Sequence, residues 1–115
     1  FAELVNILQT NRKTEWIDIH NMRIQQFGAH LHIDAHITLP YYYSLKEAHQ
    51  EMENVIHLLV KKVNRTIEFN FHLDYCKPFS CEICAIDCPF RQNPFVQTIQ
   101  WDVKNIASIA KHRHK

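Results

Sequence analysis

Several features that mark large classes of protein are scarce in this sequence. Gly28 is its single glycine, so neither of the two common glycine-rich phosphate-binding loops is present. No apolar run approaches the roughly 18 residues that a membrane-spanning helix needs, so we expect this chain not to span a membrane by itself. Thirteen basic against twelve acidic side chains give a formal net charge of +1, which argues against a nucleic-acid binder that works by neutralising phosphates.

Histidine and cysteine, by contrast, are abundant. The 115 residues include nine histidines and four cysteines, so metal binding is the first hypothesis for the chemistry of this chain. The sequence begins at Phe1 with no initiator methionine and no signal-peptide pattern, and we therefore expect it to be a piece of a longer protein.

The four cysteines lie within thirteen residues in a C-x4-C-x2-C-x3-C pattern, at Cys76, Cys81, Cys84 and Cys88. Such a tight cluster is more typical of a metal site in a reducing compartment than of a disulfide framework, so we predict a cytosolic location. Four thiolates can close a tetrahedral zinc site, which is the leading interpretation. Two alternatives stay open: free or redox-paired thiols, and an iron–sulfur cluster, because Cys84-x3-Cys88-Pro89 matches the end of the bacterial ferredoxin pattern.

Hydrophobic periodicity in the first part of the chain predicts a helix and a hairpin. Residues 3–12 carry apolar side chains at helical spacing. Apolar and polar residues alternate from Trp16 to Ile24 and again over 31–39, on either side of a turn at Gly28.

The second part of the chain predicts a helix, a strand and a terminal helix. The capping-box pattern of residues 44–47 begins a helix that extends to Val63. Residues 67–74 alternate as a third strand, and the cysteine loop follows from 76 to about 92. A second helix is expected to begin at Asn93-Pro94. The apolar stripe of this helix is expected to comprise Phe95, Ile99, Val103, Ile106 and Ala110. A basic end, Lys111–Lys115, follows it.

The order helix, strand, strand, helix, strand predicts an α+β fold, a ferredoxin-like αββαβ sandwich with a three-stranded sheet and helices on one face. We expect residues 1–75 to form this domain, with the cysteine loop and C-terminal helix of residues 76–115 packed on it. The apolar face of each strand then meets the helices, and the polar faces of all three strands share the other side of the sheet.

That shared polar face carries His20, His36, His72 and Asp74. Imidazole nitrogens and a carboxylate from neighbouring strands suit a zinc site. A solvated polar sheet face with no metal would show the same residues, and the pattern alone leaves both readings open. Five other histidines are expected to be ordinary solvent-exposed side chains that bind no metal. They are His30, His32, His57, His112 and His114.

Four short motifs in order resemble the cytoplasmic C-terminal domain of cation diffusion facilitator transporters. They are Asp18–Ile24 (DIHNMRI), His32–Leu39 (HIDAHITL), Ser44–His49 (SLKEAH) and Phe71–Asp74 (FHLD), and the resemblance extends from residue 3 to about 76. That family consists of zinc and divalent-metal/proton antiporters whose transmembrane part precedes this domain. The resemblance implies regulatory zinc ligands at His20, His36, His49, His72 and Asp74; the role of His49 is implied by the resemblance alone.

The resemblance further implies a homodimer on the cytoplasmic face of the cell membrane, attached N-terminally to a transmembrane domain. Five donors, with Asp74 counted twice if it bridges, fill six of the eight positions that two tetrahedral zinc ions need, so water or a partner chain must complete the site. We therefore expect two zinc ions at the His/Asp residues and one at the cysteines. The sequence shows no nucleophile–base pair of the kind that an enzyme would use, so we do not expect this chain to be an enzyme. The alternatives are a soluble redox or iron–sulfur electron-transfer domain and a freestanding metal-binding chaperone.

Overall fold

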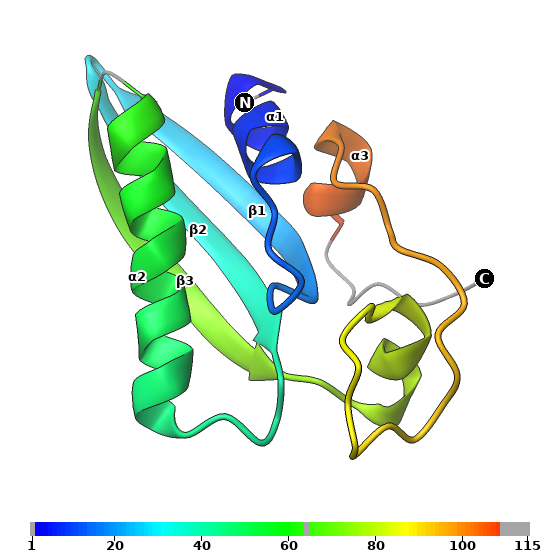
Figure 1. Ribbon diagram of the computed structural model, residues 1–115. Coiled ribbons are helices and arrows are strands. Elements are labelled where there is room, and N and C mark those ends of the chain that lie inside the picture. The colour runs from blue at the N-terminus through cyan, green and yellow to red at the C-terminus, as the bar shows by residue number, and fades with distance from the viewer. Residues whose placement is uncertain (1, 64, 109–115) are drawn as a thin grey trace.

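The computed structural model describes residues 2–63 and 65–108, and its elements follow the predicted αββαβ order. They are α1 (Ala2–Thr10), β1 (Asp18–Phe27), β2 (His30–Leu39), α2 (Leu45–Lys62) and β3 (Thr66–Tyr75), followed by the 3-10 helix η1 (Pro78–Ile83) and the short helix α3 (Val103–Ile106). Helices α1 and α2 lie on the same face of the sheet, and η1 belongs to a separate group of turns beside it (Figure 1). The predicted α+β fold is confirmed.

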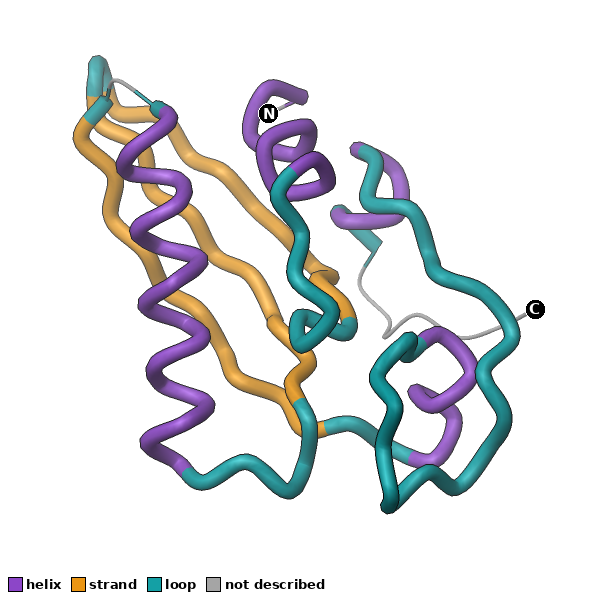
Figure 2. The backbone as a smooth tube through the Cα atoms, viewed as in Figure 1, coloured by secondary structure: helices purple, strands orange, loops and turns teal. Residues whose placement is uncertain are grey.

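The sheet has the strand order β1-β2-β3 and mixed pairing. β1 and β2 pair antiparallel through a turn in which Gly28 has φ +63°, a left-handed conformation that glycine adopts without a side-chain penalty. β2 and β3 pair parallel, with α2 as the crossover between them. The ends of β2 and β3 therefore meet at one end of the sheet, where both lead into loops (Figure 2).

The core lies between the sheet and the helices. Ile33, Ala35 and Ile37 point to this face at every second residue of β2 and are buried. Leu8 of α1 and Leu59 of α2 are buried against the same cluster. The remaining fully packed members of the cluster are Leu4, Val5, Trp16, Ile19, Met22, Leu39, Val55, Val63, Trp101 and Ile106.

Helix α2 begins with the predicted capping box. The Glu47 amide donates to Ser44 Oγ at 3.1 Å, and Glu47 Oε1 accepts from the Ser44 amide at 2.9 Å. Two otherwise unsatisfied donors at the helix start are thereby paired. None of the helices in the part of the chain that the structure describes has the length and apolar character needed to cross a bilayer.

The prediction of a long C-terminal helix from Asn93 is wrong. Residues 93–102 form no helix, and only the short helix α3 follows them, capped by Asp102 Oδ1, which accepts from the Asn105 amide at 2.7 Å. The Asn93 side chain donates to Pro78 O at 2.7 Å rather than capping a helix. Of the assumed apolar stripe, Phe95 and Val103 stay exposed, and Ile106 is buried in the core. Ala110 and residues 111–115 lie outside the described residues.

A β-bulge interrupts β1 between His20 and Arg23. Asn21 takes a left-handed conformation, φ 51°, which asparagine tolerates better than most residues, and its amide donates to Ser108 O at 2.6 Å. The extra residue reverses the side-chain alternation, so Met22 enters the core while His20, two residues earlier, lies on the polar face. The regular alternation expected from Trp16 to Ile24 is therefore wrong after His20.

Candidate metal centre

The strand register aligns the polar side chains in two rows across the sheet. In the first row, His20 pairs with His36, and His36 pairs with His72. In the second row, two residues along each strand, Thr38 pairs with both Asp18 and Asp74. Because side chains of paired residues point to the same face and the strand period is two, both rows lie on the face opposite the helices.

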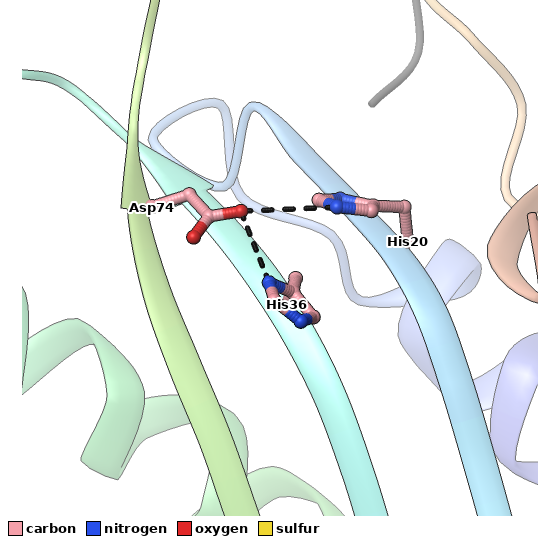
Figure 3. Close-up of side chains that lie close together, drawn as sticks. All are labelled: His20, His36 and Asp74. Atoms are coloured by element: carbon pink, nitrogen blue, oxygen red, sulfur yellow. Dashed lines mark hydrogen bonds and ion pairs between the residues drawn. The ribbon is translucent and has the colours of Figure 1, made fainter. Parts of the chain in front are cut away.

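Three of these residues converge. Asp74 Oδ2 lies 3.2 Å from His36 Nδ1 and 3.8 Å from His20 Nε2 (Figure 3). One ligand atom from each residue lies within 4.8 Å of the others. Tetrahedral zinc with bonds of about 2.0–2.2 Å places its donors about 3.3–3.5 Å apart. Small side-chain rotations are therefore enough for these three donors to share one ion.

Burial distinguishes this set from an ordinary solvated sheet face. His20 is 4% exposed, whereas His36 and Asp74 are half-buried. Thr38 Oγ1 is buried in the neighbouring row and has no hydrogen-bond partner among the described residues. A buried polar group of this kind is costly unless something else, such as water or a metal-bound ligand, satisfies it.

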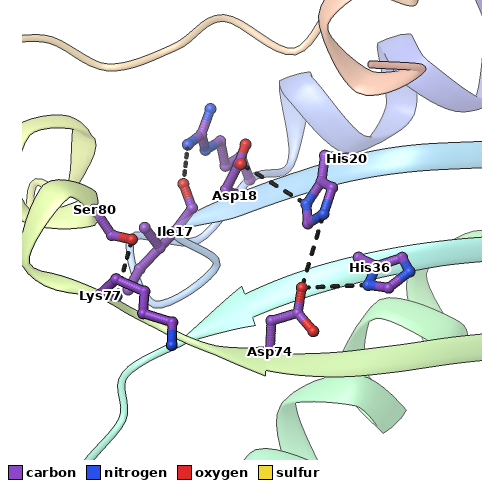
Figure 4. Close-up of polar contacts among 8 residues, drawn as sticks. Ile17, Asp18, His20, His36, Asp74, Lys77 and Ser80 are labelled. Carbon is purple, nitrogen blue, oxygen red and sulfur yellow. Dashed lines mark hydrogen bonds and ion pairs between the residues drawn. The ribbon is translucent and has the colours of Figure 1, made fainter. Parts of the chain in front are cut away.

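Asp18 is a member of the site that the sequence analysis missed. It is 2% exposed, and its Oδ2 lies 4.0 Å from His20 Nδ1, so that the two carboxylates of Asp18 and Asp74 face opposite nitrogens of one imidazole (Figure 4). A carboxylate on the far nitrogen of a ligating histidine fixes the ring and raises its basicity. The available signal was its position two residues before His20, on the same face of the strand.

Arg12 supplies a cation near Asp18. Its guanidinium donates to the carbonyls of Ile17 and Ile99, at 2.9 and 2.6 Å, and lies 3.9 Å over the ring of Trp101. Burial lowers the pKa of Arg12 to about 10, and the charge of Asp18 opposes that shift. The group stays protonated at neutral pH and offsets part of the negative charge at this end of the sheet.

The structure does not bring the other two predicted His ligands into this set. His72 is exposed and stacks on His36, with ring centroids 4.7 Å apart and planes 14° apart. His20 and His36 are 4.9 Å apart, so His20 and His72 flank the middle ring and cannot readily share one ion. His49 is exposed on α2, which packs on the opposite face of the sheet.

The four cysteines line one cavity of about 280 Å³ next to the ends of β2 and β3. All four are free thiols. Burial raises the pKa of Cys76 and of Cys84 above the usual thiol value. Among residues 2–63 and 65–108, no three cysteine sulfurs come within the 4.8 Å that His20, His36 and Asp74 satisfy.

Comparison with known proteins gives one family and several structures. The family model described as "Cation efflux protein, cytoplasmic domain" matches residues 1–76. No curated protein matches the chain. Among solved structures, the chain is similar to CzrB, a proposed zinc transporter, with 13% identity, a TM-score of 0.59, and 65% of this chain and 90% of the other covered.

Two further structures show the same fold. The zinc form of CzrB matches with 14% identity and a TM-score of 0.57, over 64% of this chain and 81% of the other. The MamB CTD magnetosome protein of Desulfamplus magnetovallimortis BW-1 matches with 13% identity and a TM-score of 0.56, over 65% of this chain and 90% of the other. At these identities the likeness establishes the ferredoxin-like fold.

Proposed function

Because the chain belongs to the family of cation efflux protein cytoplasmic domains, the cation diffusion facilitators, we propose that it is the zinc-binding regulatory and dimerisation domain of a divalent metal cation/proton antiporter. In this proposal the domain lies on the cytoplasmic face of the cell membrane and follows a transmembrane domain. The convergence of His20, His36 and Asp74 is the observation that carries the proposal. The family is one of transporter domains rather than of a known enzyme class.

The donor set supports zinc. Two imidazoles and one carboxylate are borderline ligands that zinc accepts in tetrahedral sites, whereas calcium and magnesium prefer oxygen ligands alone. Three protein ligands leave the fourth position for water or for a group from another chain. The buried Thr38 hydroxyl, in the row next to the three ligands, gives a water ligand a hydrogen-bond partner.

His72 and His49 enter the proposal as ligands of a second ion. His72 is next to His36 in the same row and exposed, so it can bind an ion on the outer side of the first site, with Asp74 as the bridge. His49 lies on the other side of the sheet, so within one subunit it cannot complete this ion. We propose that His49 reaches an ion held by a second subunit, which would tie zinc occupancy to the dimer.

Zinc binding can regulate only if the two subunit arrangements differ in zinc affinity. A shared ion supplies that difference, because its ligand shell is complete in one arrangement and incomplete in the other. A coupling free energy of about 1–3 kcal/mol is usual for such effects. In this proposal, zinc draws the two domains together and reports cytosolic zinc to the transmembrane part.

The experiment compares zinc binding by calorimetry in the wild type, Asp74→Asn and His36→Ala, with His57→Ala as the control because His57 is exposed on α2. We expect both site variants to lose at least one zinc ion per chain and the control to keep the wild-type number. Solution scattering of the same proteins with and without zinc then tests the dimer, which should become more compact with zinc. Unchanged stoichiometry in both site variants would refute the proposed site.

A further inference from the structure

The cysteine lobe, residues 76–92, lies beyond the segment that the family model matches except for Cys76, the last matched residue, and the lobe is not part of the His/Asp site. Its four cysteine side chains all line the same cavity. The opposite wall is formed by the loop after β2, where Tyr41 and Tyr42 contact the ring of Phe90 at centroid distances of 6.0 and 5.1 Å. The cavity is thus shared between the lobe and the end of the sheet.

A backbone amide donates to three of the four sulfurs. Cys76 Sγ accepts from the Tyr41 amide at 3.3 Å, and Cys81 Sγ accepts from the Gln92 amide at 3.5 Å. Cys88 Sγ accepts from the Phe90 amide at 3.3 Å, two residues downstream.

At the fourth sulfur, burial raises the pKa of Cys84, and the backbone of Ile86 and the cation of Arg91 oppose that shift. Amide donors of this kind favour the thiolate form, because a charged acceptor makes the stronger hydrogen bond. The backbone is therefore arranged to favour negative charge at three of the sulfurs, although burial raises the pKa of Cys76 and Cys84.

Arg91 organises the same turns. Its guanidinium donates to Cys81 O, Cys84 O and Ile86 O at 2.7, 2.8 and 2.6 Å, and to Asn93 O at 3.2 Å. The lobe buries little apolar surface: among the residues that the structure describes, its cluster has Ile83 and Cys84 from the lobe and Ile17 from the segment before β1 as its buried members. One cation therefore holds most of the turns and lies beside the cavity, where it offsets the charge of thiolates.

From this arrangement we propose that the cysteine lobe binds one zinc ion through Cys76, Cys81, Cys84 and Cys88, in a site separate from the His/Asp site. Zinc–sulfur bonds of about 2.3 Å would bring the sulfurs about 3.8 Å apart. The lobe must therefore contract around the ion, and the 280 Å³ cavity gives the side chains room to rotate inward. Binding releases the thiol protons, leaves the sulfur oxidation state unchanged and gives the lobe the cross-link that its small core lacks.

Cobalt substitution tests this proposal on the full chain under reducing conditions. A Co²⁺ ion bound by thiolates gives a strong sulfur-to-metal charge-transfer absorption, and its amplitude with excess Co²⁺ should correspond to one thiolate-bound ion per chain in the wild type. The band should persist in Asp74→Asn, which disables the His/Asp site, and disappear in Cys81→Ser/Cys84→Ser. The thiols of the wild type and of Asp74→Asn should react at least about tenfold more slowly with a thiol reagent when Zn²⁺ is present in excess over all the proposed sites.

Two results would overturn the proposal. One is a wild-type protein whose thiols react equally fast with and without Zn²⁺ and which gives no charge-transfer band. The other is a purified protein that carries iron and acid-labile sulfide on these cysteines. Circular dichroism of the double Ser variant shows whether the sheet still folds. If it does not, the thiol-protection measurement on the wild type and on Asp74→Asn decides, and it is independent of the fate of the His/Asp site.

Discussion

Replacement of Arg91 by alanine is the sharpest test of how the cysteine lobe is held together. The change removes four hydrogen bonds from one guanidinium, three of them to carbonyls at 2.6–2.8 Å. It leaves the sheet and its helices untouched, because the bonds lie within residues 81–93. We therefore expect local opening of the lobe without global unfolding.

The magnitude follows from the number and the environment of these bonds. Hydrogen bonds from a charged donor contribute about 1.5 kcal/mol each at the lower end of their range, or about 6 kcal/mol for four. Release of the arginine side chain returns about 2 kcal/mol of conformational entropy, and the half-buried carbonyls regain water when the lobe opens. A net loss of about 3 kcal/mol remains, which corresponds to a roughly 100-fold increase in the open population.

Amide hydrogen exchange measures this population directly. The informative amides are those of Cys84, which donates to Cys81 O, and of Val96 and Gln97, which both donate to Glu82 O. Their exchange should accelerate roughly 100-fold in Arg91→Ala when opening and closing are fast, while amides of β2 stay unchanged. The control is Arg65→Ala, since Arg65 is exposed just before β3. Acceleration below about threefold at all three amides would refute the role assigned to Arg91.

Three further predictions concern the two sites and the hairpin. Burial raises the pKa of Cys76 and Cys84, so zinc must displace at least these two protons when it binds the lobe. Its apparent affinity for the lobe should therefore fall at least about 100-fold per pH unit as the pH decreases below neutrality, and a pH-independent affinity in a competitive chelator titration would contradict this. Asp18→Asn should weaken zinc binding at His20 about 10–100-fold in calorimetry. A variant that binds zinc with the wild-type affinity would show that Asp18 does not support the site. Gly28→Ala places a side chain at φ +63° and should lower the free energy of unfolding, measured by urea titration, by about 1 kcal/mol. Gly28→Asn should lower it by less, and equal stability of Gly28→Ala and the wild type would contradict this prediction.

The sheet face of the candidate site could be predicted because strand alternation is a strong and local signal. Leu31, Ile33 and Ala35 alternate with polar residues along β2. Because successive side chains of a strand point to opposite faces, this alternation alone places His36 on the face away from the helices. The capping box at Ser44 is equally local, and it was predicted correctly for the same reason. What sequence could not supply is register, since the alignment of His20, His36 and His72 depends on strand pairings between distant segments.

The errors arise where tertiary contacts override local pattern. The bulge at Asn21 depends on a hydrogen bond to Ser108, a residue far along the chain, so no window around β1 could reveal it. The Asn93-Pro94 pattern is a good helix start, yet the amides of Val96 and Gln97 bond to Glu82 O and hold the backbone out of a helix. Asp18 was overlooked because a single carboxylate next to a strand start resembles any solvated side chain.

The parallel pairing of β2 and β3 also sets the order in which the candidate metal site can assemble. His20 and His36 lie on a hairpin whose strands are joined by a short turn, whereas the first residue of β3 paired to β2, Thr66, lies 36 residues after its partner His30. Closing the longer loop costs more chain entropy before its contacts form, so we expect β3 to join the sheet late in folding. Asp74 arrives with β3, so a metal ion that needs all three ligands binds after the folding barrier and lengthens the lifetime of the folded state rather than speeding its formation.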